Sequence, residues 1–193
     1  MLLVAGLRNP GSRYEGTRHN LGGDVVSVLA DRHGASFKKA RRFIRAEIAE
    51  TRIGDVPVVL ARPRTFMNES GQAVAPLVSY YKVELDGLLV VHDDIDLPFT
   101  KLKVQLGGGS GGNNGVDSVA RSMARPAFWR LKCGVGRPPG PMDPADYVLR
   151  PFRSEERESA GVMVQLAADV VETFVASGGD SARQRAGELN TLG

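Results

Sequence analysis

Cysteine and histidine are scarce in this 193-residue sequence, which has one cysteine and three histidines. Cys133 has no partner for an internal disulfide, and no Cys/His spacing typical of a zinc site occurs. No apolar run approaches the roughly 18 residues of a membrane helix, and the apolar start at Met1 is soon interrupted by Gly6 and Arg8. These absences argue against a disulfide scaffold, a structural metal, a membrane span and a secretion signal, so we expect a cytoplasmic location.

The overall composition is that of an ordinary globular protein, with 42% hydrophobic and 24% charged residues. The length fits one domain, so we predict a single domain over residues 1–193. The net charge of +3 permits a polyanionic partner without requiring one. Basic residues gather in two stretches, 38–45 and 121–137, and each fits either a binding surface or an ordinary solvated face.

Apolar periodicity predicts strands that alternate with helices along the chain. Strands are expected at residues 2–7, 44–48, 56–61, 88–91, 102–106 and 128–135. Helices are expected near 21–33, 74–81, 116–123 and 154–178, with a short terminal helix from residue 180. The predicted fold class is a single-domain α/β fold with a twisted, mixed, partly parallel sheet and helices on both faces. The Gly/Pro-rich segment 136–146 is expected to form a lid or a mobile connection.

Polar residues cluster directly after three of the predicted strands. Residues 9–20 follow the first strand, 93–96 follow the strand at 88–91, and a glycine tract at 107–115 follows the strand at 102–106. Open α/β sheets place their sites in the crevice at the carboxyl ends of strands. We therefore expect these three segments to meet at one edge of the sheet.

The glycine tract matches the dinucleotide-binding pattern G-x-G-x-x-G, but it lacks the context of that pattern. A dinucleotide site needs an acidic residue about 20 positions further on. No Asp or Glu occurs between Asp117 and Asp143, and there is no Gly-Lys-Ser/Thr for a P-loop. The favoured interpretation is that the glycines let backbone N–H groups approach an anionic ligand closely.

Ser110 in the same tract matches G-x-S-x-G, the nucleophile motif of α/β-hydrolases. In that fold the histidine follows the serine, whereas all three histidines of this chain precede Ser110, so the fold is excluded by residue order. The order His19, Asp93, Ser110 still matches another convergent triad. A serine hydrolase therefore remains an alternative.

Three carboxylates lie close together at Asp93, Asp94 and Asp96. Such a group could hold Mg²⁺ through oxygen ligands, which would suggest a phosphohydrolase. The simpler interpretation is that Asp94 and Asp96 are solvated or cap backbone groups, while Asp93 orients a neighbour. Because no dedicated phosphate loop accompanies these acids, we predict no metal and no cofactor.

A series of short motifs runs in order through nearly the whole chain. These motifs are LRNPG at 7–11, Tyr14, TRHN at 17–20, FMNESG at 66–71, HDDIDLP at 92–98, the glycine tract ending in Asn114-Gly115, and GVGRP at 134–138. Each fragment alone is weak, but the ordered series is specific and resembles the bacterial peptidyl-tRNA hydrolase family. The resemblance implies a monomeric, metal-independent esterase that cleaves the bond between a peptide and the 3′-ribose of tRNA and so recycles tRNA from stalled translation.

The resemblance also assigns the reacting groups. His19 matches the general base that activates water, and Asp93 matches the acid that orients it. General-base catalysis of this kind contributes about 10²- to 10⁴-fold in rate. No covalent nucleophile is needed, because a ribose ester is reactive enough for activated water.

Substrate contacts are implied at five further positions. Asn9, Asn68 and Asn114 match asparagines that bind the peptide backbone, the attacking water and the acceptor end, and Asn9 helps to reject tRNA whose aminoacyl group is unblocked. Tyr14 and Phe66 match aromatic positions that contact the terminal nucleotide. The two basic stretches then become candidate phosphate tracks, together with Lys101 and Lys103.

Four positions depart from the family pattern. Asn113 stands where the family usually has His, Arg8 and Thr100 stand where it has Gly, and Gly23 stands where it has a bulky residue. Since His19 and its acidic partner are present, we expect activity to persist. A weakened, tRNA-binding paralogue is the alternative that the missing histidine leaves open.

Overall fold

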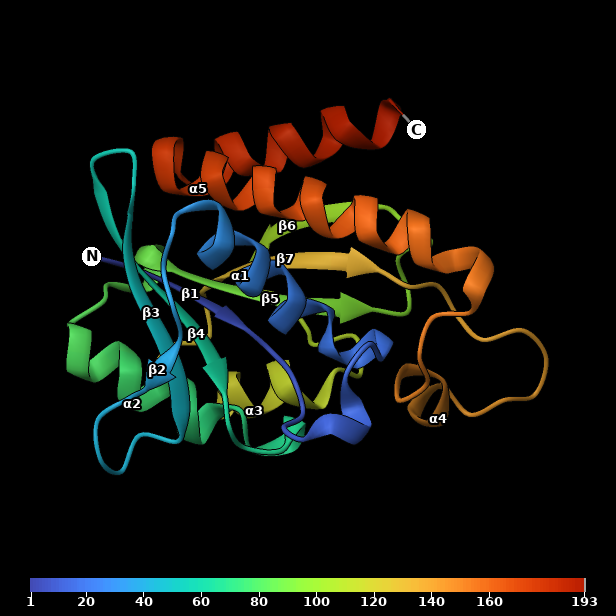
Figure 1. Cartoon of the computed structure of the whole chain (residues 1–193), viewed down its shortest axis with the longest axis horizontal. Helices are drawn as coiled ribbons and strands as arrows, with labels where there is room; N and C mark the ends of the chain where they lie inside the picture. The colour runs from blue at the N-terminus through green and yellow to red at the C-terminus, as the bar shows by residue number, and fades with distance from the viewer. Residues whose placement is uncertain (193) are drawn as a thin grey trace.

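Seven strands form one sheet in the order β2-β3-β4-β1-β5-β7-β6, with helices on both faces (Figure 1). The computed structural model describes residues 1–192, so Gly193, the last residue of the predicted domain, lies outside the described residues. The strands are β1 (Leu2–Gly6), β2 (Lys38–Lys39), β3 (Ala46–Ile53), β4 (Val56–Pro63), β5 (Leu88–Asp94), β6 (Leu102–Leu106) and β7 (Trp129–Gly134). The helices are α1 (Leu21–Arg32), α2 (Gly71–Tyr81), α3 (Asn114–Ser122), α4 (Pro144–Val148) and α5 (Arg157–Thr191), and the 3-10 turns are η1 (Ser12–Tyr14), η2 (Arg18–Asn20), η3 (Met67–Glu69), η4 (Leu85–Gly87) and η5 (Ser154–Glu156).

The centre of the sheet is parallel and its edges are antiparallel. Strands β4, β1, β5 and β7 pair in parallel, whereas β2 and β3 on one side and β6 on the other pair antiparallel with their neighbours. This arrangement confirms the predicted mixed, partly parallel sheet. The chain leaves β1 toward β4 on one side and returns to β5 on the other, so a topological switch point lies between β1 and β5.

Side chains of the central strands alternate between two apolar layers, as the pleat of a strand requires. Val4 of β1 packs with α1 and α5, whereas its neighbours Leu3 and Ala5 pack with α2 and α3. Figure 1 shows α1 and α5 on one face of the sheet and α2 and α3 on the other. The parallel strands are thus buried on both faces, which explains their continuous apolar runs.

Helix α1 begins in direct contact with the sheet because two glycines allow it. A Cβ atom on Gly22 would overlap the carbonyl oxygen of Val91 in β5, and one on Gly6 would overlap the carbonyl of Gly22. This close approach places η2, which directly precedes α1, over the carboxyl ends of β1 and β5. His19, in η2, therefore lies at the switch point between β1 and β5.

Helix α5 reverses direction at Gly178, where φ is 83° and ψ is 179° (Figure 1). The predicted stop at this glycine and the following terminal helix are therefore confirmed. By length and composition alone, Ser154–Thr191 could cross a membrane, but half of its most apolar window is buried inside the protein. Its residues Val171 and Phe174 pack in the apolar layer above the sheet, as expected of a core helix.

Two sequence expectations need correction. Strand β5 runs through Asp94, pairing with β7, so Asp93 lies in the strand rather than after it. Strand β6 is antiparallel to β7, so the glycine tract starts at the opposite edge, where the Gly107 N–H donates to Phe128 O at 3.0 Å, and then runs back to the site. Residues 144–146 of the predicted lid belong to helix α4.

Candidate active site

A cavity of about 470 Å³ lies at the carboxyl ends of β1 and β5. Five of the seven predicted site residues line it: Asn9, His19, Asn68, Asp93 and Asn114. Tyr14 and Phe66 are not among the lining residues: Tyr14 is half-buried in η1 beneath the Arg13 guanidinium, and Phe66 is 53% exposed before η3. The segments after β1 and β5 and the end of the glycine tract thus meet as predicted. The glycine tract, however, reaches the site only because it runs back from the opposite edge of the sheet.

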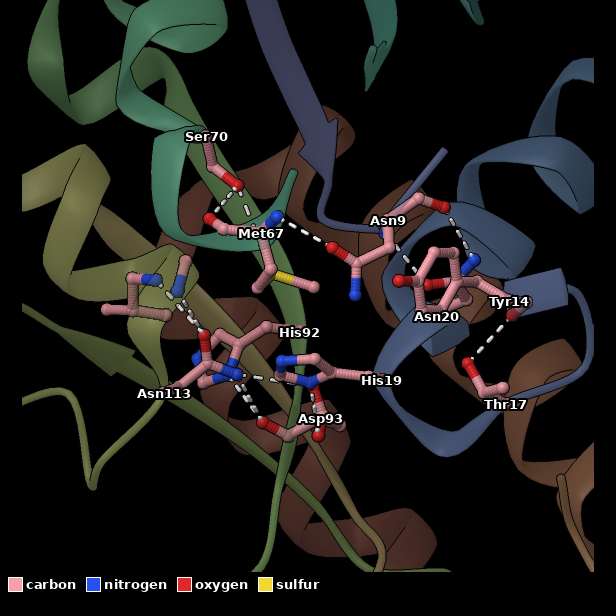
Figure 2. A network of polar contacts seen from close by, with 12 residues as sticks. Asn9, Tyr14, Thr17, His19, Asn20, Met67, Ser70, His92, Asp93 and Asn113 are labelled. Atoms are coloured by element: carbon pink, nitrogen blue, oxygen red, sulfur yellow. Dashed lines mark hydrogen bonds and ion pairs between the residues drawn. The ribbon is translucent and has the colours of Figure 1, made fainter. Parts of the chain in front are cut away.

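The centre of the cavity is a histidine–aspartate pair. His19 Nδ1 lies 2.8 Å from Asp93 Oδ1 and 3.0 Å from Oδ2, and the Asp93 side chain is almost fully buried (Figure 2). Because a carboxylate accepts hydrogen bonds, this contact places the proton on Nδ1. The second ring nitrogen, Nε2, is then the basic one.

The charge state of His19 reflects two opposing effects. Burial lowers the pKa of His19, but the charge of Asp93 and its hydrogen bond raise it, and the net pKa lies above the ordinary value. A raised pKa makes His19 a stronger base than an ordinary imidazole, which suits a histidine that accepts a proton from water.

Two neighbours hold Asp93 in place. The Asn113 side-chain nitrogen donates to both Asp93 Oδ1 and the Asp93 carbonyl oxygen, each at 3.2 Å. The buried His92 donates from Nδ1 to the same carbonyl at 2.7 Å, and burial lowers its pKa to about 4, which keeps it neutral. Asn113 also caps α3, because its Oδ1 accepts from the N–H groups of Gly115 and Val116 at 3.0 and 3.1 Å.

Asn9 is oriented so that only a donor faces the cavity. Its Oδ1 accepts from the Met67 N–H at 2.7 Å, while the Asn20 amide bonds both the N–H and the C=O of Asn9. In Figure 2 the Asn9 side-chain nitrogen is turned toward His19. The Asn20 side chain serves this clamp and makes no cap hydrogen bond to α1.

The remaining lining residues give the cavity an amide rim and an apolar wall. Asn68 in η3 and Asn114 at the start of α3 are exposed there. The apolar wall, which sequence reasoning missed, comes from Met67, Ile95, Val148 and Leu149. Val148 and Leu149 follow a Gly/Pro-rich segment and carry no motif, so nothing in the sequence marked them.

The hydrogen bonds of Ser110 do not support the serine triad. Its hydroxyl oxygen accepts from the Gly112 N–H at 3.2 Å. Within residues 1–192 no hydrogen bond joins Ser110 to His19, although both line the cavity.

The neighbouring acidic side chains are engaged by the protein itself. Asp94 accepts from the Asp96 N–H at 2.8 Å and lies 3.3 Å from Lys132 Nζ, while Asp96 pairs with Arg137. Among the described residues, no three His, Cys, Asp or Glu side chains are grouped to hold a metal ion.

Comparison with known proteins places this geometry in a family. The sequence model described as peptidyl-tRNA hydrolase matches residues 3–191. The chain belongs to the peptidyl-tRNA hydrolase family. It is 48% identical to the peptidyl-tRNA hydrolase of Frankia casuarinae over 95% of this chain and 92% of that protein, and 48% identical to that of Deinococcus deserti over 95% and 84%. The crystal structure of peptidyl-tRNA hydrolase from Acinetobacter baumannii superimposes with a TM-score of 0.89 at 32% identity, covering 96% of this chain and 94% of that one.

Gly23 and Arg8, two of the departures expected from the resemblance, pack against each other. A Cβ on Gly23 would lie 3.0 Å from Cδ and 3.2 Å from Cβ of Arg8, so the missing side chain makes room for the arginine. The Arg8 guanidinium in turn donates to Glu47 at 2.7 Å. Thr100, a third expected departure, has a φ of 73°, a conformation that favours glycine.

The second basic stretch is not one surface, contrary to expectation. Arg130 is buried and donates to the Gly109 carbonyl at 2.8 Å, and Lys132 pairs with Asp94. Lys101 donates to the Asn190 carbonyl at 2.9 Å, whereas Lys103 is exposed. In the first stretch, residues 38–45, every lysine and arginine is exposed.

Proposed function

We propose that this protein hydrolyses the ester bond between a peptide, or an N-blocked amino acid, and the 3′-ribose of tRNA, and so releases tRNA for reuse after stalled or abortive translation. Membership of the peptidyl-tRNA hydrolase family over residues 3–191 supports this function. The observation that carries it is the His19–Asp93 contact of 2.8 Å inside an open cavity. This pair supplies a base where an ester carbonyl would lie.

Water is the proposed nucleophile. His19 Nε2 takes a proton from water as the water oxygen bonds to the ester carbonyl carbon, and Asp93 stabilises the resulting imidazolium. The tetrahedral intermediate then breaks its bond to the ribose 3′-oxygen, and the imidazolium returns its proton to that leaving group. A carboxylic acid and a free ribose hydroxyl result, and His19 is neutral again.

Asn9 is proposed to select blocked substrates. Its side-chain oxygen is occupied by the Met67 N–H, so only its NH₂ group is free to bind substrate. That donor can bind a peptide carbonyl, but it cannot accept a hydrogen bond from a free α-ammonium group, which has only donors. Asn68 and Asn114 are proposed to bind the water and the acceptor end, while Tyr14 and Phe66 contact the terminal nucleotide from outside the cavity.

The remaining assignments follow from the same proposal. We propose a cytoplasmic monomer that needs no metal or cofactor, whose partner is the acceptor stem and 3′ end of peptidyl-tRNA. Asp143, Pro144 and Ala145 line the cavity, so a lid over 136–146 would close directly on the substrate. The donor that Asn113 supplies to Asp93 favours an active enzyme over a weakened paralogue.

The deciding experiment compares N-acetylaminoacyl-tRNA with free aminoacyl-tRNA. The enzyme should release tRNA from the acetylated form and spare the free form; equal cleavage of both would reject the proposal. Ser110→Ala should retain activity, whereas a serine hydrolase would lose it. Excess chelator should likewise leave the rate unchanged.

A further inference from the structure

An exposed aromatic ring stands on a tight turn between β2 and β3. Phe43 is 87% exposed and has a φ of 80°. The turn is closed by the Ile44 N–H, which donates to the Arg41 carbonyl at 2.9 Å. A bulky residue at positive φ is strained, and an exposed apolar ring contributes no burial free energy to the folded state. Neither the strain nor the exposure stabilises the fold, so a binding role would account for this ring.

Uncompensated positive charge surrounds the ring. The Arg42 guanidinium lies 5.1 Å from the Phe43 ring centroid, and that of Arg41 lies 5.1 Å from the Tyr80 ring. Within residues 1–192, Lys39, Arg41 and Arg42 form no ion pair with a carboxylate, whereas the neighbouring Lys38 pairs with Glu50 at 2.7 Å.

The turn is connected to the cavity by a short series of contacts. The Arg64 N–H donates to the Arg45 carbonyl at 2.8 Å, and Arg45 Nη1 lies 3.9 Å from Glu69 Oε2. Glu69 directly follows Asn68, which lines the cavity. Arg64, Phe66 and Asn68 are all exposed, so polar and aromatic side chains continue from the cavity toward the turn.

We infer that Arg41, Arg42 and Phe43, here called the Phe43 turn, bind the RNA of the substrate beyond its 3′ end. Guanidinium groups neutralise phosphates, and an aromatic ring flanked by arginine stacks on a base or packs against a ribose. The positive charge around the ring favours RNA over a protein partner, because the closely spaced phosphates of RNA can neutralise several cations at once. The inference rests on the proposed function for the identity of the RNA, and it adds a second contact region outside the cavity.

The test measures the affinity for deacylated tRNA and the hydrolysis of N-acetylaminoacyl-tRNA by the full-length enzyme. Phe43→Ala should weaken tRNA binding at least about fivefold and raise KM with kcat unchanged. The double variant R41Q/R42Q should also lower the slope of log Kd against log salt by about 1 per lost phosphate contact. Arg185→Gln on α5 removes a half-exposed arginine that pairs with Glu188 far from the turn; it is the control and should change neither.

A second substitution separates binding from structure. Phe43→Gly removes the ring and relieves the positive φ, so Tm should rise while tRNA affinity falls. Unchanged tRNA affinity in Phe43→Ala and R41Q/R42Q would overturn the inference, and so would a change confined to self-association measured by sedimentation. If these variants fail to respond while the parent still cleaves N-acetylaminoacyl-tRNA, the Phe43 turn is refuted and the proposed function stands.

Discussion

Asn113 offers the sharpest test of how the proposed catalytic pair, His19 and Asp93, is held. Its amide performs two tasks: the nitrogen donates to Asp93, and the oxygen caps α3. Asn113→Ser keeps a capping oxygen but removes the amide nitrogen that donates to Asp93. Asn113→Ala removes both. Comparison of the two variants therefore isolates the contribution of the Asp93 contact.

The magnitude follows from the geometry. A hydrogen bond to a charged group contributes about 1.5–3 kcal/mol, and the 3.2 Å length places this one at the weak end. If Asn113→Ser loses the free energy of this hydrogen bond in the transition state, kcat/KM should fall by about tenfold. Asn113→Ala should show the same kinetic loss plus about 1 kcal/mol less unfolding free energy, because the helix cap is gone.

Asn113→Asp adds a second measurement, the pH profile of kcat/KM, which would not change if Asn113 had a purely structural role. The cap is kept, but a second carboxylate now lies beside Asp93. Added negative charge favours the imidazolium and raises the pKa of His19 further, so the acid limb of kcat/KM against pH should shift to higher pH. The assay is hydrolysis of N-acetylaminoacyl-tRNA across the pH range. Parental rates in Asn113→Ser together with an unshifted profile in Asn113→Asp would refute the reasoning.

Three further outcomes are expected. In the parent enzyme, kcat/KM should fall as pH drops through the raised pKa of His19, because the protonated ring cannot accept a proton; a profile flat through that pH would contradict this. Thr100→Gly should raise the free energy of unfolding by about 1 kcal/mol in denaturant titrations, since the strained positive φ is relieved, and a decrease would be the contrary result. Gly23→Ala should destabilise the parent but not the Arg8→Gly background, and additive effects in that double-mutant cycle would show that the two positions are independent.

Much of the fold could be predicted, because local patterns specify it. The apolar run after Leu2, the helix that ends before His33 and the chain reversal at Gly178 all follow from periodicity and glycine placement. The alternation of apolar and polar residues in β6 is typical of an antiparallel strand with one solvated face, whereas the parallel strands of this sheet carry continuous apolar runs. The partner β7 is distant along the chain, so the pairing of β6, and with it the return path of the glycine tract, could not be predicted.

The contact between His19 and Asp93 could be predicted from the sequence, whereas the contacts that support it could not. His19 follows β1, and Asp93 lies near the end of β5. These two buried strands flank the switch point, where sites are expected. The Asn113 contact and the burial of Arg130 depend on partners about 20 residues distant, and no local pattern encodes them. Arg130 was grouped with the surface charges, but its guanidinium supports the Gly109 carbonyl.

Single-turnover hydrolysis of N-acetylaminoacyl-tRNA by His19→Ala tests the central claim most directly. If His19 is the base, the rate should fall by about 10²- to 10⁴-fold while Tm and tRNA affinity stay close to those of the parent. A variant that retains both its fold and a rate within about tenfold of the parent would contradict the account.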